Sequence, residues 1–375
     1  MALAPMRRVV TTRVCLLRLK TCSTELGVTV NRLRVRITLV AVIVCAVQLA
    51  CTFLVSCAKK VGESPRGAAK VPVIGVVNYG EHPILNVIVQ AFQARLRERG
   101  LREGENIRIA WKDVGGDENR AAAATTSLLN SGVDLIMSIT TPVSQAVYKQ
   151  AKGKVPIVFC AVTDPISAGL VSSWQNTPGS GITGTSDRWP YKEQLDLIKQ
   201  IVPKAKRVGF PYNSGEANSR YALTQVQPLA KERGLEIVAA VATNTSEVRR
   251  AVESLVARGV DVIYVSSDNT VMAGFQAVLK VAYERKIPVI VGESANVERG
   301  GLATYSVGYP QLAKVTADIV LRILGGEEPG RIPVATFQGE DLYVNPEAAR
   351  KMGITLDPAL VRKAHVVNIK SGNAG

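Results

Sequence analysis

Residues 260–271 read VDVIYVSSDNTV, and this stretch decides the fold. Apart from Asp261, the part up to Val265 is an apolar run of the kind that forms a strand buried on both faces of a sheet. The sequence turns polar over residues 266–270 and continues into a helical pattern over residues 271–285. In open α/β sheets, ligands bind where a parallel strand ends in small polar residues at the start of a helix. The stretch therefore predicts a ligand site.

The same construction occurs earlier in the chain. Residues 127–138, SLLNSGVDLIMS, are similar to residues 254–265, SLVARGVDVIYV, and the earlier copy ends in TTPVS at 140–144. Two matching strand–loop–helix units predict two similar domains whose loops face each other. We therefore expect a protein with a cleft between two lobes.

Strand and helix patterns alternate through the rest of the sequence. Strands are predicted at 71–78, 106–111, 133–139 and 155–162, and a second series at 207–213, 235–241, 260–265 and 287–292. Regular alternation of this kind favours parallel sheets with right-handed crossovers. The predicted fold class is α/β, with two Rossmann-like lobes, parallel sheets and a ligand cleft between them.

The first 57 residues have the pattern of a signal peptide. Arg32, Arg34 and Arg36 precede an uncharged apolar run over residues 37–56, and the run ends in Leu-Val-Ser before Cys57. A basic flank, an apolar stretch and small residues before a cleavage point are typical of secretion signals. The ending resembles the lipobox of bacterial lipoproteins, which implies that Cys57 is lipidated. The alternative is an uncleaved transmembrane anchor, since the run is long enough to span a bilayer.

The lipobox interpretation places a signal peptide at 1–57 and a linker at 58–70, where Gly, Ser and Pro occur. In both interpretations the folded part is tethered to a membrane in the cell envelope, facing the periplasm or the exterior.

Composition argues against several other classes of protein. The net charge is +15, but residues 1–56 carry eight basic residues and one acidic residue; the other 38 basic and 30 acidic residues leave +8 for residues 57–375. These charges are scattered and do not form a basic stripe with aromatics, so we expect no nucleic-acid partner. Five of the six cysteines lie at or before Cys57, which leaves no disulfide framework beyond it, and Cys160 is expected to be a buried apolar side chain.

Several short motifs resemble a known family when taken in order. They are Glu81-His82-Pro83, Thr141-Pro142, Thr163-Asp164-Pro165, residues 183–187 (TGTSD), residues 213–219 (NSGEANS) and Asp268-Asn269. From about residue 71 to about residue 364 the chain resembles bacterial ABC-transporter substrate-binding proteins of the tryptophan/tyrosine-binding type, which have the periplasmic-binding-protein type 1 fold.

The resemblance implies two lobes joined by three crossovers, near Ser186, Val307 and Pro333. The first lobe would comprise residues 71–186 and 308–333, and the second residues 187–307 and 334–375. The implied function is a lipid-anchored receptor that closes over a small ligand, expected to be an amino acid and in particular an aromatic one, and delivers it to an ABC permease.

The strongest candidate for ligand contact is Asp268, at the junction of strand and helix. If the ligand is an amino acid, its ammonium group would pair with this carboxylate through a charge-assisted hydrogen bond. Thr141 and Ser144 lie at an expected helix N-terminus, where free N–H groups and the helix dipole favour an anion such as an α-carboxylate. Helix capping is the alternative role for each of these residues.

Further candidates follow from the loops of both predicted lobes. Tyr79, Tyr212, Tyr264 and Phe275 could form an aromatic wall, although a core position is the favoured alternative for Tyr264 and Phe275. Polar contacts are expected from the remaining candidates, which are His82, Asp164, Asn213, Asn218, Ser219 and Asn269. The alternative for His82 is local bonding at the helix start before Pro83.

Two other functions remain open from the residues alone. An envelope enzyme could use Glu81, His82 and Asp164, and a sensory module could present its ligand state to a membrane partner. We expect no enzyme, because His82 and His365 are the only histidines and no metal site or triad can be assembled from them. No cofactor is expected, since glycine-rich nucleotide motifs are absent.

Overall fold

Short apolar runs form the central strands of two sheets in the computed structural model, which describes residues 70–80, 82–175, 177–337 and 341–368. Strands β3 (Leu135–Ile139), β4 (Ile157–Cys160) and β8 (Val262–Val265) are buried along their whole length. Strands with helices on both faces of their sheet have this pattern. The edge strands β2 (Arg108–Asp113) and β7 (Glu236–Val241) are more exposed.

The first sheet has the strand order β11-β5-β4-β3-β1-β2, and all of its pairings are parallel. At its centre, Val76 lies between Trp111 of β2 and Met137 of β3. We call the part of the chain built on this sheet the first lobe. Its remaining elements are β1 (Val73–Asn78), α2 (Pro83–Glu98), α3 (Glu118–Asn130), α4 (Thr141–Ala151), β5 (Ile182–Ser186), α11 (Tyr309–Leu324) and β11 (Ala335–Thr336).

The second sheet has the order β13-β12-β10-β9-β8-β6-β7 and forms the second lobe. Its N-terminal elements are α5 (Tyr191–Ile201), β6 (Arg207–Tyr212), α6 (Ala217–Glu232), α7 (Val248–Ala257), α8 (Asn269–Ala273) and α9 (Phe275–Arg285). They are followed by β9 (Val289–Val291), α10 (Ser294–Glu298), β10 (Ala303–Ser306), β12 (Asp341–Val344), α12 (Pro346–Lys351), α13 (Pro358–Lys363) and β13 (His365–Val366).

The internal repeat predicted from the sequence is present in the topology. Strands β2-β1-β3-β4-β5 of the first sheet have the same order as β7-β6-β8-β9-β10 of the second. The α/β class is confirmed, and its sheets are mainly parallel. One pairing differs, because β12 runs antiparallel to β10. The chain passes from β10 into the first lobe and returns from that lobe into β12, so the two strands run in opposite directions.

The first sheet extends slightly further along the chain than the boundary at residue 333 would place it. Strand β11 follows that boundary and pairs with β5, Ala335 lying beside Thr185. We therefore propose that the third crossover lies between Thr336 and Asp341. We propose that the other two crossovers lie between β5 and α5 and between β10 and α11.

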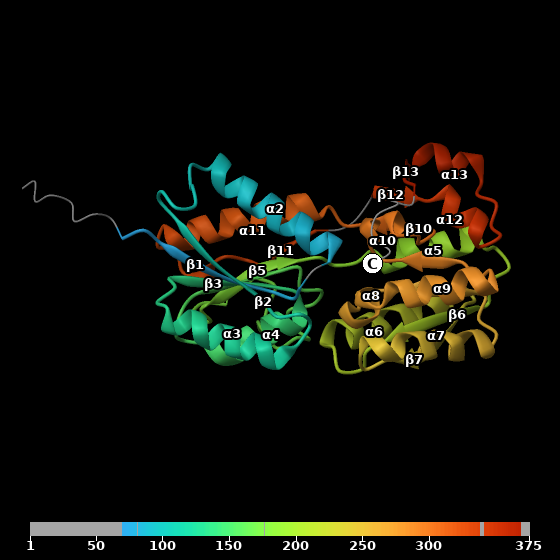
Figure 1. Ribbon diagram of the computed structural model, residues 1–375, viewed down its shortest axis with the longest axis horizontal. Helices are drawn as coiled ribbons and strands as arrows, with labels where there is room; N and C mark the ends of the chain where they lie inside the picture. Colours follow the sequence, from blue (N-terminus) through green and yellow to red (C-terminus); the bar gives the residue numbers. More distant parts are fainter. Residues whose placement is uncertain (1–69, 81, 176, 338–340, 369–375) are drawn as a thin grey trace, which may run out of the picture. The chain divides into compact units, whose positions relative to one another are not determined.

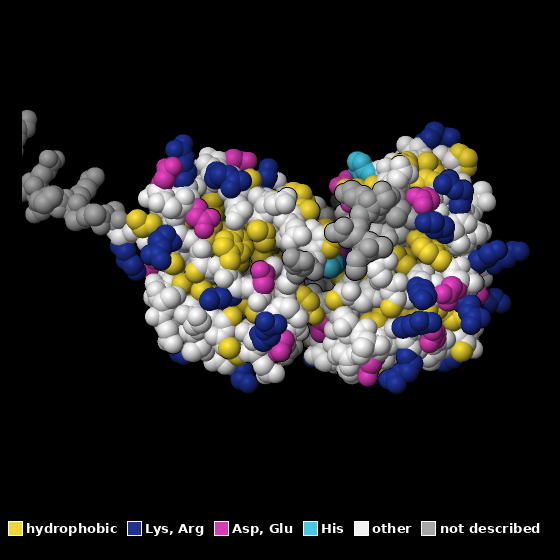
Figure 2. Space-filling model, in the orientation of Figure 1, with side chains coloured by type: hydrophobic (Ala, Val, Ile, Leu, Met, Phe, Trp, Pro, Cys, Tyr) yellow, Lys and Arg dark blue, Asp and Glu magenta, His cyan; other side chains and the backbone are white. Residues whose placement is uncertain are grey.

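Helices cover both faces of the first sheet (Figure 1). Helices α2 and α11 pack against each other on one face, and α3 and α4 on the other, each pair over its own apolar core. In the second lobe, α5 packs on α6 and α7 on α9 around one continuous core. Cys160 is buried in the first lobe, as predicted. On the face in Figure 2, Lys and Arg side chains are scattered among Asp and Glu.

The predicted signal peptide, Cys57 and the linker, apart from Lys70, lie outside the described residues. Within the part that is described, none of the helices has the length and apolar character needed to cross a membrane.

Candidate functional site

A pocket lies where strands of both sheets end, at the position that the sequence predicted for a ligand. It contains about 580 Å³ of empty space, part of it open to solvent. The first lobe contributes the segments after β1, β3, β4 and β5, and the second lobe those after β8 and β9. Its lining residues are Tyr79, His82, Ile84, Leu85, Thr140, Thr141, Ala161, Thr163, Asp187, Trp189, Asn218, Ser267, Asp268, Asn269, Met272, Ala273, Glu293 and Tyr309.

Helix α4 begins at the pocket wall. Thr141 is its first residue and Thr140 its N-cap. The first N–H groups of a helix have no partners within the helix, and together with the dipole they favour an anion. The hydroxyl of Thr140 is buried and has no hydrogen-bond partner among the described residues. Thr140 also has a φ of 82°, a strained conformation for a residue other than glycine, and such strain is concentrated at functional sites.

Asp187 directly follows β5 and is buried at the pocket wall. Its Oδ2 accepts hydrogen bonds from Trp189 Nε1 at 3.2 Å and from the Tyr309 hydroxyl at 3.0 Å. Burial raises the pKa of Asp187, although these two hydrogen bonds lower it in part. Trp189 can lie here because residue 292 is a glycine, since a Cβ at that position would overlap the indole ring.

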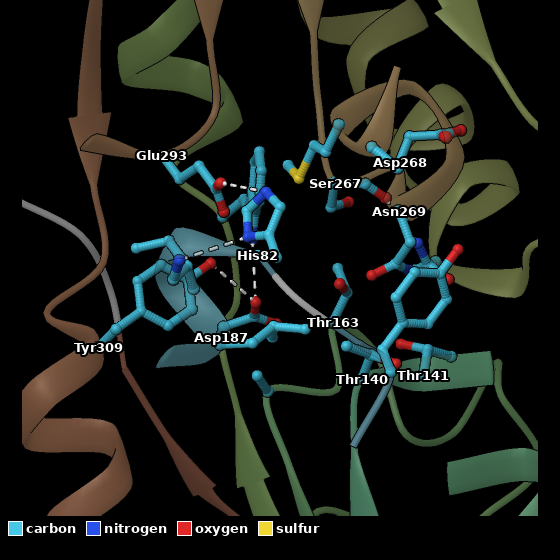
Figure 3. A pocket seen from close by; sticks show the side chains of 18 residues that line it. His82, Thr140, Thr141, Thr163, Asp187, Ser267, Asp268, Asn269, Glu293 and Tyr309 are labelled. Carbon is cyan, nitrogen blue, oxygen red and sulfur yellow. Dashed lines mark hydrogen bonds and ion pairs between the residues drawn. The ribbon is translucent and has the colours of Figure 1, made fainter. Parts of the chain in front are cut away.

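His82 and Glu293 meet at the same end of the pocket (Figure 3). His82 is the N-cap of α2, and its Nδ1 accepts a hydrogen bond from the backbone N–H of Ile84. Its Nε2 lies 3.3 Å from Oε1 of Glu293, the residue just before α10. Burial lowers the pKa of His82 to about 4, and the charge of Arg299 acts in the same direction. Burial raises the pKa of Glu293 to about 8.

Both carboxylate oxygens of Asp268 accept hydrogen bonds from other residues of the protein. Oδ1 accepts from the Val271 N–H at 2.8 Å, which caps α8, and Oδ2 accepts from the Asn213 N–H at 2.5 Å and from the Ser219 hydroxyl. In Figure 3 this carboxylate points away from His82 and Glu293. Burial, followed by the charge of Glu216, raises its pKa to about 7. The geometry is that of a buried helix cap.

Glu216 organises the neighbouring loop of the second lobe. It accepts from the side chains of Asn218 and Asn269 and from the backbone N–H groups of Asn269 and Thr270. Asn218 Nδ2 also donates to the carbonyl of Ser267, while its Oδ1, on the pocket wall, has no partner among the described residues.

The structure brings six of the ten candidates from the sequence onto the pocket wall, namely Tyr79, His82, Thr141, Asn218, Asp268 and Asn269. The other four form hydrogen bonds with protein groups around the pocket. Ser144 donates to the carbonyl of Thr140, and Asp164 accepts from the N–H of Ser167. Asn213 binds Thr270, and Ser219 binds Asp268. Tyr264 and Phe275 are fully buried in the second core.

Sequence reasoning did not select Asp187, Glu293, Trp189 or Tyr309. Asp187 ended one of the motifs quoted above, and Glu293 follows a predicted strand, so the rule applied to residues 266–270 would have found both. Nothing in the local sequence marked Trp189 or Tyr309, which reach the pocket from a crossover and from α11. Among the described residues, no group of three or more His, Cys, Asp or Glu side chains is arranged to hold a metal ion.

Comparison with known proteins gives a consistent picture. A family model described as ABC transporter substrate binding protein matches residues 73–368. The chain is 34% identical to a tyrosine-binding protein of Clostridioides difficile (strain R20291) over 279 residues, which are 74% of this chain and 80% of the relative.

Two solved structures are similar over nearly their whole length. A conserved domain protein from Vibrio cholerae has a TM-score of 0.77 at 34% identity, covering 80% of this chain and all of that one. An ABC domain from Streptococcus pneumoniae in complex with L-Trp has a TM-score of 0.75 at 31% identity, covering 79% of this chain and 99% of that one. The fold is that of periplasmic-binding-protein type 1 solute-binding proteins.

Proposed function

Since the chain belongs to the ABC transporter substrate-binding proteins, an extracytoplasmic family, we propose that it is a receptor for an amino acid with an aromatic side chain. The observation that carries the proposal is the arrangement of polar groups in the pocket. Buried carboxyl groups lie at one end, with Asp187 and Glu293, and the N-terminus of α4 lies at the other (Figure 3). An amino acid offers the two complementary charges, an ammonium group and a carboxylate.

The walls between these ends suit an apolar side chain. Trp189, Tyr309 and Tyr79 present aromatic rings, while Leu85 and Met272 present aliphatic surface. Aromatic and thioether side chains pack favourably on aromatic ligands. Relatives at similar identity that are named for tyrosine or were solved with L-Trp support the same ligand class.

We extend the proposal to location and partner. The Leu-Val-Ser-Cys57 ending of the apolar run supports a lipid anchor in the cell envelope, and family membership supports delivery of the ligand to an ABC permease. Closure over the ligand would follow from contacts made by both lobes, because a ligand bound by both favours the closed state.

The test is a binding panel on the full chain purified in detergent. Thermal melts with the common amino acids, several sugars and several polyols would be followed by calorimetry on the hits. A ligand that binds only the folded state stabilises it by about 4 kcal/mol at roughly 1,000 times its Kd. We expect tryptophan, tyrosine or phenylalanine to give the largest shift. Stabilisation by sugars or polyols alone, with no response to amino acids, would contradict the proposal.

A further inference from the structure

We infer that Asp187 and Glu293 together form the subsite for the ligand's ammonium group, Asp187 lying at the start of the crossover after β5 and Glu293 following β9 of the second lobe. The inference rests on the proposed function and names the chemistry that selects the ligand, which is a positively charged primary amine. It replaces Asp268, the residue that sequence alone favoured for this role.

Only one of the two carboxyl oxygens of Asp187, Oδ2, accepts hydrogen bonds from Trp189 and Tyr309. The Asp187 side chain is 95% buried, since the residue is 5% exposed, and it lines the pocket. Trp189 and Tyr309 both donate to Oδ2 and thereby fix the carboxylate's orientation. Oδ1 has no hydrogen bond of ordinary geometry from the described residues, although the Thr163 hydroxyl lies near enough to influence its titration. A buried oxygen without a partner costs free energy until a ligand supplies a donor.

Glu293 is the corresponding acceptor of the second lobe. It is only 2% exposed, and it occupies the N-cap position of α10 without capping that helix. Its side chain turns into the pocket instead, where Oε1 faces His82 at 3.3 Å and has no hydrogen bond from any described residue. The Glu293 side chain therefore lines the pocket and does not cap the helix.

The two carboxyl groups lack a positive partner within the described part of the chain. None of its Lys or Arg side chains forms an ion pair with Asp187 or Glu293, and His82 is held neutral by burial. Arg299 lies close enough to act on Glu293, but its guanidinium donates to the Met272 carbonyl and to Asn296. A buried carboxyl group is stable in its ionised form only beside a partner of opposite charge. An ammonium group supplies that charge together with three N–H donors.

The position of the subsite also fits a ligand with an acid close to its amine. Asp187 follows β5 and Thr140 follows β3, with only β4 between these strands, so the backbones from which the two side chains come are about 10 Å apart. A small zwitterion can bridge this span with hydrogen bonds of about 2.9 Å at each end. Because Glu293 belongs to the second lobe and Thr140 to the first, a zwitterion bound at both ends contacts both lobes, and these contacts favour the closed state.

Calorimetry with matched ligands tests the assignment. The full chain and its Asp187→Asn and Glu293→Gln variants would be titrated with L-tryptophan, with tryptamine and with indole-3-propionate. Tryptamine keeps the amine without the acid, and indole-3-propionate keeps the acid without the amine. Asp196→Asn and Glu253→Gln, which change surface carboxylates on α5 and α7, serve as matched controls.

We expect Asp187→Asn to weaken binding of the two amines by about 30-fold or more, as for loss of one partner in a buried charge pair. Binding of indole-3-propionate should change less than about threefold by the same scale, since it has no amine. The ligand-free variant should melt at the same or a higher temperature, because a buried charge has been removed. Glu293→Gln should likewise weaken the binding of both amines.

The outcomes separate this inference from the proposed function. Equal losses for tryptophan and indole-3-propionate, or a lower melting temperature with unchanged affinity for amines, would overturn the ammonium subsite. Tryptophan binding that is unchanged in both variants would overturn it while leaving the proposed function in place. Binding of tryptamine that depends on Asp187, with no binding of amino acids, would support the subsite and contradict the proposed function. Failure of every amine to bind the parent chain would overturn both.

Discussion

His82 Nε2 lies 3.3 Å from Oε1 of Glu293, and the two residues come from different lobes. Because Nδ1 of His82 accepts the Ile84 N–H, the proton of the neutral imidazole is on Nε2 and faces Glu293. Burial holds the pKa of His82 at about 4 and that of Glu293 at about 8. Near neutral pH, this contact is therefore between two uncharged groups and is not an ion pair.

Affinity for an amine ligand should rise with pH. Burial is the main cause of the raised pKa of Glu293, with Asp187 acting in the same direction and Arg299 against it. An ammonium group binds best to an ionised carboxylate. Below about pH 8, Glu293 must therefore lose a proton when the amine binds. Between about pH 5.5 and about pH 7, where amines stay charged, affinity should increase by up to about tenfold per pH unit.

Calorimetry at several pH values measures this dependence, and buffers of different ionisation enthalpy count the protons released. Glu293→Gln should flatten the profile. A parent profile that is flat over the same range would show that Glu293 is already ionised or far from the amine.

The unliganded protein should lose stability in mild acid through His82. Its folded pKa of about 4 lies below the ordinary value of 6.5. This contribution is therefore present above about pH 6.5 and is lost as the pH falls toward 4. At pH 5 the loss amounts to about 2 kcal/mol in the free energy of unfolding. The raised pKa values of Glu293 and Asp268 have the opposite effect, because these two groups make the folded state more stable as the pH falls.

Urea unfolding of the parent and of His82→Asn at pH 7 and pH 5 isolates the histidine, since asparagine can still cap α2. The variant should lose about 2 kcal/mol less than the parent between these pH values. Equal losses would mean that His82 titrates normally in the folded protein.

Asp268→Ala should affect folding more than ligand affinity. The substitution leaves the N–H groups of Val271 and Asn213 and the hydroxyl of Ser219 without their acceptor. Unpartnered buried groups cost about 1–3 kcal/mol each, so for these three groups we expect a loss of about 3 kcal/mol or more in the free energy of unfolding. Asp357→Ala, at the exposed N-cap of α13, is the matched control and should cost about 1 kcal/mol.

Denaturant unfolding gives the stabilities, and calorimetry on the folded fraction gives the affinities. A stable Asp268→Ala protein that no longer binds an amino acid would restore Asp268 as the partner of the ligand's ammonium group.

Thr140→Gly should raise the stability of the protein and lower its affinity for the ligand. Thr140 has a φ of 82° and a ψ of 159°, which glycine adopts without strain, and its buried hydroxyl lacks a partner. Relief of the strain should raise the free energy of unfolding by about 1 kcal/mol. Loss of the hydroxyl at the α4 end of the pocket should weaken ligand binding. Lys286→Gly, at a φ of 52° after α9, should relieve strain without changing affinity. Destabilisation by Thr140→Gly would contradict the strain argument.

Cys57→Ser should abolish lipid attachment, because the lipobox chemistry needs that thiol. Metabolic labelling with a fatty acid measures attachment, and membrane fractionation measures retention. A variant that still carries label would contradict the lipobox assignment. A variant without label that stays in the membrane would show that residues 37–56 act as an uncleaved anchor.

The sequence by itself determined the architecture. The apolar runs 260–265 and 133–139 fixed buried parallel strands, and their similarity predicted the repeat that the two sheets display. The polar residues after these strands located the pocket, because ligands bind where such strands end. These features are local in the chain, so periodicity and composition suffice to identify them.

Only the tertiary structure decided which polar side chains are free for a ligand. Asp268 and Asp187 both follow strands, and nothing in the sequence separates their roles. Partners distant in the chain do so: Asn213 and Ser219 fill the oxygens of Asp268, whereas Trp189 and Tyr309 hold one oxygen of Asp187 and leave the other open. The crossings of the chain between the lobes likewise decide that β12 is antiparallel to β10 and that His82 contacts Glu293. Hydrogen-bond saturation and charge pairing are properties of neighbours in space, and a linear pattern does not specify them.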